Sequence, residues 1–168
     1  MRRRMMVVSP SRLFAAMFFL IMMFCSSCFA EQLKFADWIG IAKPDPLTQE
    51  QSKKIGSYAN DGISTLWLSD SDSDQEMVQL TLESKKAMAA EYYSYQIDRV
   101  DTLAIRSAKK GCESNCLIDA VPKKGELINT MQKGLQIKFE YDSDPDITQH
   151  PTFSLRGFSR AYNWLLSE

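Results

Sequence analysis

Asp70-Ser-Asp-Ser-Asp74 is the stretch of this chain that most resembles a metal-binding motif. It places carboxylates at alternate positions, as the calcium loop of an EF-hand does. That loop also demands glycine at its sixth position and glutamate at its twelfth. Those positions hold Gln75 and Thr81 here. The sequence therefore predicts a solvated polar loop with no metal, and the same interpretation applies to Asp142-Ser-Asp-Pro-Asp146.

Two cysteines, Cys112 and Cys116, could form a redox pair or part of a metal site. Their spacing is not Cys-x-x-Cys, and no histidine or second cysteine pair stands nearby. In an oxidising compartment the default is a disulfide between them. So short a loop contributes only about 2 kcal/mol of stability. We expect this bond to hold a local turn.

His150 is the only histidine, and it precedes Pro151 in an expected surface loop. No serine motif or cysteine nucleophile accompanies it, so it is a poor candidate for a general base. The sequence accordingly predicts no enzyme activity and no cofactor.

Lysines near the two cysteines suggest binding instead. On a β-rich domain they could share one face and meet an acidic partner, although charged loops can also be merely solvated. These lysines are Lys109, Lys110, Lys123, Lys124 and Lys133.

The first thirty residues predict where the chain acts. Arginines occupy positions 2–4, an uncharged apolar run extends over 13–24, and small residues stand at −3 and −1 before Glu31. This is the pattern of a secretory signal peptide cleaved between Ala30 and Glu31. The run is shorter than the roughly 20 apolar residues of a membrane span. Lipidation of Cys28, which would tether the domain, stays open as an alternative. The expected location is the periplasm, the outer membrane or the exterior.

Composition narrows the classes of partner. Four of the 20 basic residues and none of the 21 acidic residues precede Glu31, so residues 31–168 carry 16 basic and 21 acidic side chains, a net charge of −5. Such a chain is not a general nucleic-acid binder. It contains no further apolar run of span length, and its size of about 138 residues fits one domain.

Alternation of apolar and polar residues predicts a mainly β fold, an antiparallel β-sandwich or barrel-like sheet. The expected strands lie at 33–42, 63–68, 78–82, 93–97, 103–105, 117–121 and 135–141. Alternation also directs Tyr93 and Tyr95 to one face and Tyr92 to the other. Thr48 and Gln51 fit a capping box and predict a brief helix over 49–55. A turn is expected at Asn60-Asp61-Gly62.

Two further helices are expected. One covers 126–133 and ends at Gly134, a good residue for a helix C-terminus. The other is C-terminal, because Phe158, Ala161, Tyr162 and Leu165 follow helical spacing. Ser154 could cap its start, Gly157 would allow close packing and Phe158 would anchor the helix to a sheet.

The C-terminal third resembles the invasion-associated locus B family of Gram-negative envelope proteins. The resemblance rests on a Lys133-Gly134 turn into a strand and on a Ser-Leu-x-Gly-Phe-x-x-Ala pattern. The residues that carry this pattern are Ser154, Leu155, Gly157, Phe158 and Ala161. Trp38 corresponds to the early tryptophan strand of the family. The resemblance implies a signal peptide followed by one β-rich domain, residues 31–168.

The resemblance also implies a function. It favours an exported, non-enzymatic envelope protein that binds a protein or an acidic envelope or host-cell surface, with a role in virulence or invasion. The alternative is a structural or accessory component of an envelope, conjugation or secretion assembly. A small periplasmic enzyme is the third and weakest hypothesis.

Overall fold

The computed structural model describes residues 30–44, 51–71, 75–85, 92–98, 104–107, 109–111, 115–144 and 147–167. Glu31–Glu168 form one compact unit. Residues 1–29 of the predicted signal peptide, Asp72, Asp74, Cys112 and Asp146 lie outside the described residues. In the part that is described, no helix has the length and apolar character needed to cross a membrane.

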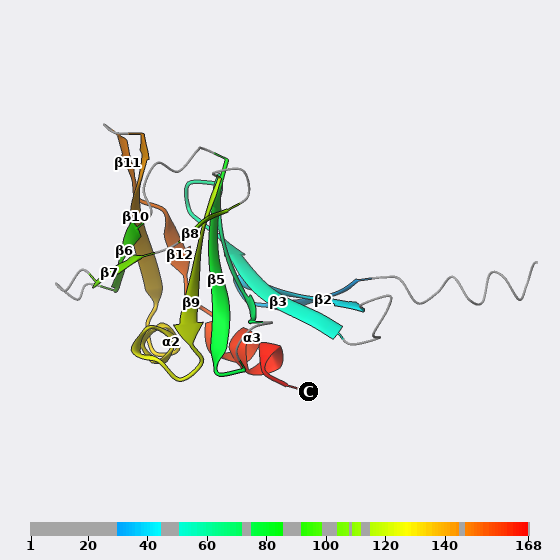
Figure 1. Ribbon diagram of the computed structural model, residues 1–168. Helices are drawn as coiled ribbons and strands as arrows, with labels where there is room; N and C mark the ends of the chain where they lie inside the picture. The colour runs from blue at the N-terminus through cyan, green and yellow to red at the C-terminus, as the bar shows by residue number, and fades with distance from the viewer. Residues whose placement is uncertain are drawn as a thin grey trace, which may run out of the picture. The chain divides into compact units, whose positions relative to one another are not determined.

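The described strands form two open antiparallel sheets (Figure 1), so the predicted β-sandwich class is confirmed. The seven-stranded sheet has the order β1 (Glu31–Phe35), β2 (Trp38–Pro44), β3 (Gln51–Tyr58), β4 (Ser64–Asp70), β5 (Met77–Ser84), β9 (Cys116–Pro122) and β8 (Lys109–Gly111). The five-stranded sheet has the order β11 (Ile147–Gln149), β10 (Gln136–Asp144), β6 (Tyr92–Ile97) and β7 (Ala104–Ser107), with β12 (Thr152–Ser154) also paired to β10.

The core follows from the alternation in the sequence. Every second residue of the central strands points inward, and burying these side chains is the main source of stability. Residues of the core include Leu66, Leu68, Val78, Leu80, Leu82, Tyr93, Ile137, Phe139 and Phe153. Tyr92 is 54% exposed while Tyr93 is fully buried, as alternation predicts.

Two predictions near the N-terminus are wrong. The single strand expected over 33–42 is a hairpin, because Ala36 and Asp37 form a turn between β1 and β2. The helix expected over 49–55 is contradicted by β3, which begins at Gln51. The apolar face of that helix was thin, and pairing with both β2 and β4 satisfies the backbone of β3 instead.

The C-terminal helix is confirmed as α3 (Phe158–Leu165), which packs on β1, β2 and β3. Its buried residues are the four that the helical spacing identified. The residue that precedes it is Gly157, and no side chain caps it, so the capping role expected for Ser154 is wrong.

The shorter helix, α2 (Glu126–Met131), buries Leu127, Ile128 and Met131 and lies beside β9. Gly134 does not adopt the left-handed conformation typical of a helix C-terminus. Glycine is needed there for space, because a Cβ at this position would lie 2.5 Å from the Cγ2 of Ile97.

One edge of β10 is covered by two short strands in succession. β11 pairs with residues 141–144 of β10 and β12 pairs with residues 136–138, while β6 occupies the opposite edge. His150 and Pro151 separate the two short strands. The backbone N–H of Phe139 donates to the carbonyl of Pro151 at 2.9 Å, so backbone hydrogen bonding along this edge of β10 continues between the two short strands.

Candidate functional site

The turn between β1 and β2 is held by an unusually dense set of hydrogen bonds. Its residues, Ala36 and Asp37, connect the paired residues Phe35 and Trp38. Ala36 has a φ of 56°, in the left-handed region that costs a residue with a Cβ about 1–2 kcal/mol. Such strain persists only where the surroundings determine the conformation. Here the residues that hydrogen-bond to Asp37 determine the conformation of the turn.

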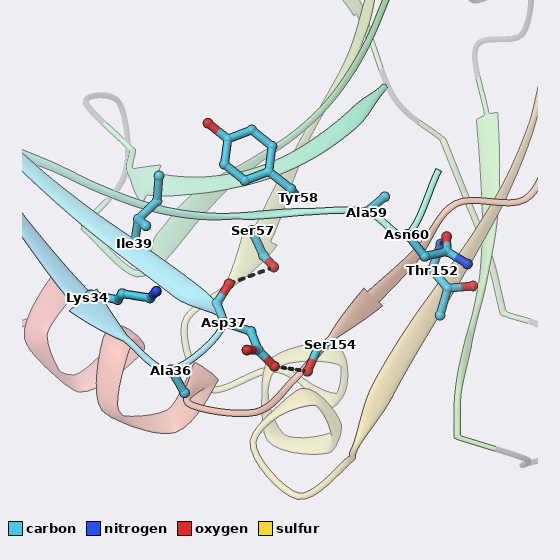
Figure 2. A pocket seen from close by; sticks show the side chains of 10 residues that line it. All are labelled: Lys34, Ala36, Asp37, Ile39, Ser57, Tyr58, Ala59, Asn60, Thr152 and Ser154. Carbon is cyan, nitrogen blue, oxygen red and sulfur yellow. Dashed lines mark hydrogen bonds between the residues drawn. The ribbon is translucent and has the colours of Figure 1, made fainter. Parts of the chain in front are cut away.

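Asp37 makes three hydrogen bonds to residues far away in the sequence. Its N–H donates to the carbonyl of Arg156 at 3.3 Å. Its carbonyl accepts from the Ser57 hydroxyl at 3.0 Å, and its Oδ2 accepts from the Ser154 hydroxyl at 2.7 Å (Figure 2). The turn is therefore joined to both β3 and the segment that leads into α3.

A pocket of about 510 Å³ opens beside this turn. Its lining comes from β1, β2, β3 and β12, and Figure 2 shows Asp37 between the serines of β3 and β12. The lining residues are Lys34, Ala36, Asp37, Ile39, Ser57, Tyr58, Ala59, Asn60, Thr152 and Ser154. We refer to it as the Asp37 pocket.

The groups available for binding in the Asp37 pocket are mostly donors. Among the described residues, the ammonium group of Lys34 and the hydroxyl of Tyr58 have no hydrogen-bond or ion-pair partner. Tyr58 is 66% exposed. The Oδ1 of Asn60 accepts from the N–H of Thr152 at 3.0 Å, while its amide nitrogen carries two further donors. This set suits a ligand that presents carboxylate, phosphate, sulfate or hydroxyl oxygens.

The Ser154 hydroxyl is occupied structurally. It donates to Asp37 and accepts from the backbone N–H of Arg156 at 3.2 Å. Both interactions tie the β1–β2 turn to the segment that leads into α3.

A second polar cluster joins the two sheets. The hydroxyl of Tyr93 in β6 donates to Oδ2 of Asp119 in β9 at 2.8 Å. Arg106 of β7 forms an ion pair with the same carboxylate. Burial, with the nearby Asp119 charge adding to it, raises the pKa of Tyr93 well above its ordinary range. The hydrogen bond to Asp119 raises the pKa of Arg106.

Tyr93 and Arg106 both donate to the carboxylate of Asp119. These contacts join β6 and β7 of one sheet to β9 of the other. Sequence reasoning missed this cluster. The alternating pattern predicted the face on which Tyr93 lies. No local pattern indicated that Arg106 and Asp119 would contact it or each other.

The predicted disulfide lies at the β8–β9 connection. Cys116 is fully buried at the start of β9 and pairs in register with Gly111, the residue before Cys112. Cys112 itself lies outside the described residues, so the bond stays a prediction.

The structure separates the lysines that the sequence grouped together. Lys109 and Lys110 pair with Ile118 and Leu117, whereas Lys123 and Lys124 follow the far end of β9. From the residue opposite Lys109, five residues of strand place Lys123 roughly 16 Å away. Lys123 also forms an ion pair with Asp70 at 2.7 Å. Lys133 lies beyond the end of α2.

The residues of the family pattern close the fold. Leu155, Phe158 and Ala161 are at most 4% exposed. The carbonyl of Ser154 accepts from the indole N–H of Trp38 at 2.9 Å, and the ring of Phe158 lies 4.9 Å from that of Trp38. Gly157 packs directly against the β1–β2 turn, at Phe35 and Ala36. The pattern and the early tryptophan are therefore parts of one packing unit.

The remaining candidates fit their surface interpretation. The Nδ1 of His150 lies 3.3 Å from Oε2 of Glu140, and both side chains are more than a third exposed. Within the described ranges, no group of three or more histidine, cysteine, aspartate or glutamate side chains could hold a metal ion.

Together, the fold and the pocket define a two-sheet β protein with a preformed polar pocket. No protein-family model matches the chain, and no curated protein matches it. A solved structure does: the crystal structure of invasion associated protein B from Bartonella henselae aligns with a TM-score of 0.61 and 13% identity, over 81% of this chain and 96% of that one. The predicted resemblance is thus confirmed at the level of the fold.

Proposed function

We propose that this chain is an exported, non-enzymatic envelope protein that works by binding. The observation that carries the proposal is the Asp37 pocket. Its hydrogen-bonded frame is complete without a ligand, and its uncommitted groups, Lys34 and Tyr58, are suited to recognition. The fold shared with a protein described as invasion associated supports an exported protein with a part in the invasion of host cells.

The partner is proposed to be an acidic or hydroxyl-rich surface. A compact ammonium group attracts anionic oxygens, and a tyrosine ring with a free hydroxyl adds contact area at little entropic cost. Because the pocket frame is rigid, little order has to be created when the ligand binds.

The test uses the full chain, expressed in its own bacterium in place of the wild type. The variant Lys34→Ala/Tyr58→Ala removes the two uncommitted groups of the pocket. The matched control, Lys133→Ala/Tyr92→Ala, removes the same residue types from exposed positions elsewhere. Invasion of cultured host cells, scored as bacteria protected from an external antibiotic, should fall several-fold in the first variant and stay unchanged in the control.

Two results would overturn this function. Equal invasion by the pocket variant and the control would remove the pocket from the function. A deletion strain that invades normally but leaks periplasmic protein would favour the accessory envelope role instead.

We also propose cleavage between Ala30 and Glu31. β1 begins at Glu31, which pairs with Ala42, so the first strand starts directly after the predicted junction. Lipidation at Cys28 would leave only Phe29 and Ala30 between the lipid and the sheet. The intact mass of the protein purified from the envelope distinguishes a chain that begins at Glu31 from a lipidated one.

A further inference from the structure

The outward face of the seven-stranded sheet carries a continuous row of residues. Directly paired residues of antiparallel strands project from the same face. The strand registers therefore align one residue from every strand, and we call this set the transverse row. Its members, in order across the sheet, are Lys34, Ile39, Gly56, Trp67, Thr81, Ile118 and Lys109.

A lysine stands at each end of the transverse row, beside a pocket. Lys34 lines the Asp37 pocket. Lys109 lines a pocket of about 530 Å³, whose other lining residues include Gln79, Ile118 and Ala120 of the same face and Asp119, whose carboxylate is ion-paired with Arg106. Six inter-strand spacings of about 4.8 Å separate the two ends by about 29 Å. The row thus links two hollows at the opposite edges of one sheet.

The middle of the row is a fixed aromatic surface. A Cβ on Gly56 would lie 2.2 Å from Cε3 of Trp67, so the indole covers that glycine. The indole N–H donates to Oε2 of Glu83 at 3.0 Å. The Nζ of Lys54 lies 4.2 Å from the ring centroid. The ring is therefore held in place before any ligand arrives.

Charge is segregated on this face. Its described strand residues include four lysines, Lys34, Lys43, Lys54 and Lys109, and one carboxylate, Glu83. That carboxylate is already hydrogen-bonded to Trp67. At the rim, the carboxylate of Asp37 accepts from Ser154. A basic face on a chain with a net charge of −5 over residues 31–168 attracts polyanions while the rest of the surface repels them.

We propose that the transverse row is the binding track for a linear anionic glycan, which runs from the Asp37 pocket to the pocket at Lys109. The proposal rests on the proposed binding function and names its ligand class. The row offers cations at its ends and an aromatic surface in between, which matches a chain of hydroxyl-bearing rings with regularly spaced acidic groups.

A glycan fits this face better than a bilayer does. Proteins that lie on a membrane insert protruding apolar side chains. Ile39, Trp67 and Ile118 are only partly exposed. Tyr58, which carries a hydroxyl, is the most exposed large hydrophobic residue of this sheet at 66%, and outside the sheet the most exposed are Leu135 at 80%, Ile105 at 72% and Tyr92 at 54%. The row itself thus lacks the fully protruding apolar side chains of an insertion surface.

The test measures binding of the purified mature domain, the compact unit Glu31–Glu168, by isothermal titration calorimetry. The probes are heparin oligosaccharides for a sulfated host glycan, and polygalacturonate for a carboxylated glycan of the kind found in envelopes. Uncharged dextran is the ligand control, and phosphatidylglycerol vesicles represent a bilayer. Lys34→Glu/Lys109→Glu reverses the charge at both ends of the track. The matched control, Lys124→Glu/Lys133→Glu, makes the same charge change elsewhere.

We expect at least one anionic glycan to bind and dextran to fail. The track variant should weaken that binding at least tenfold, whereas the control variant should change it less than twofold. Because each lysine–anion contact releases counterions, the slope of log Kd against log salt concentration should also fall in the track variant. Preference for heparin over polygalacturonate, or the reverse, identifies the source of the glycan.

Three outcomes overturn the track. They are binding to vesicles but to neither glycan, equal weakening by the two double variants, and no binding to any probe. None of these touches the broader proposal, because invasion in the pocket-variant strains is measured separately. If Lys34→Ala/Tyr58→Ala leaves invasion normal while the domain still binds glycan through Trp67 and Lys109, the proposed function is refuted and the track is kept.

Discussion

Gly157 lies directly against the carbonyl oxygen of Phe35, so that a Cβ on this glycine would stand 2.0 Å from that oxygen. Gly157 also has a φ of 91°. Glycine is therefore required for two separate reasons at the point where α3 meets the β1–β2 turn. The backbone is left-handed there, and the carbonyl oxygen of Phe35 leaves no room for a Cβ. The first prediction separates them.

Gly157→Ala should destabilise the domain by about 3 kcal/mol or more, because the strain of the positive φ adds to a clash with backbone atoms. Gly62→Ala is the matched control. Gly62 has a φ of 68° but nothing within 4 Å of its Cβ position, so only the conformational cost of about 1 kcal/mol remains. Urea unfolding monitored by tryptophan fluorescence measures both. Equal losses would show that the contact with Phe35 relaxes without penalty.

The contacts of Asp119 with Tyr93 and Arg106, which join the two sheets, should contribute substantially to the free energy of unfolding. Asp119→Ala leaves Arg106 and the buried hydroxyl of Tyr93 without their acceptor, and we expect a loss of about 2–3 kcal/mol. Lys123→Ala breaks the more exposed ion pair with Asp70 and should lose less than about 1 kcal/mol. Both are read from urea midpoints. If Asp119→Ala is as mild as Lys123→Ala, the cluster does not hold the sheets together.

Stability should fall in strong alkali. Burial raises the pKa of Tyr162 to about 12 and raises that of Tyr93 further. A raised pKa in the folded state means that the unfolded chain loses these protons first, from about pH 10. The contribution is therefore intact below pH 10 and declines as pH rises, by at most about 1.4 kcal/mol per pH unit for each tyrosine.

Thermal melts between pH 8 and pH 12 test this dependence. Tyr162→Phe should flatten the alkaline decline relative to wild type, whereas Tyr58→Phe, at an exposed position, should leave its slope unchanged. A decline that is identical in all three proteins would assign it to other groups.

Cys112 and Cys116 should be bonded in the protein purified from the envelope. Alkylation without reductant, followed by mass spectrometry, should label neither of them. Reduction before alkylation should then label both. Two labelled thiols in the unreduced sample would refute the pairing. A Cys112→Ser/Cys116→Ser protein should lose only about 2 kcal/mol, since the loop is short.

Deletion of residues 158–168 should abolish cooperative unfolding. It would expose the β1–β3 surface that Phe158, Ala161, Tyr162 and Leu165 cover. A graded version is Phe158→Ala, for which removal of a fully buried ring predicts a loss of about 3–5 kcal/mol. Asn163→Ala, on the exposed side of the same helix, is the control. A truncated protein that still melts cooperatively would show that α3 is peripheral.

The sequence predicted the strands that alternate clearly and both helices at 126–133 and near the C-terminus. It failed where pairing overrides local pattern. Gln51–Tyr58 carries polar residues that suggested a helix start, yet β2 and β4 enclose it as a strand. No local signal marks Ala36 and Asp37 as a turn, because the contacts that stabilise it come from Ser57, Ser154 and Arg156.

The candidate site was largely hidden for the same reason. Ser154 belonged to a recognised pattern, but its partner Asp37 is separated from it by more than a hundred residues. The lysines show the converse. Closeness along the chain grouped Lys109 with Lys123, whereas the registers place Lys109 in line with Lys34. Only the order of strands within a sheet makes such distant residues neighbours.

The packing of α3 on β1–β3 also constrains when this protein can fold. The first strands of the domain are completed by almost the last residues described, so they lack their cover until synthesis has passed residue 165. Contacts between the two ends of a domain, such as those of α3 with β1–β3, raise its contact order and slow its folding. The polypeptide would thus stay loosely structured while it is being made, which is the state that a translocation channel can thread. Completion of the native state would then await arrival on the far side of the membrane.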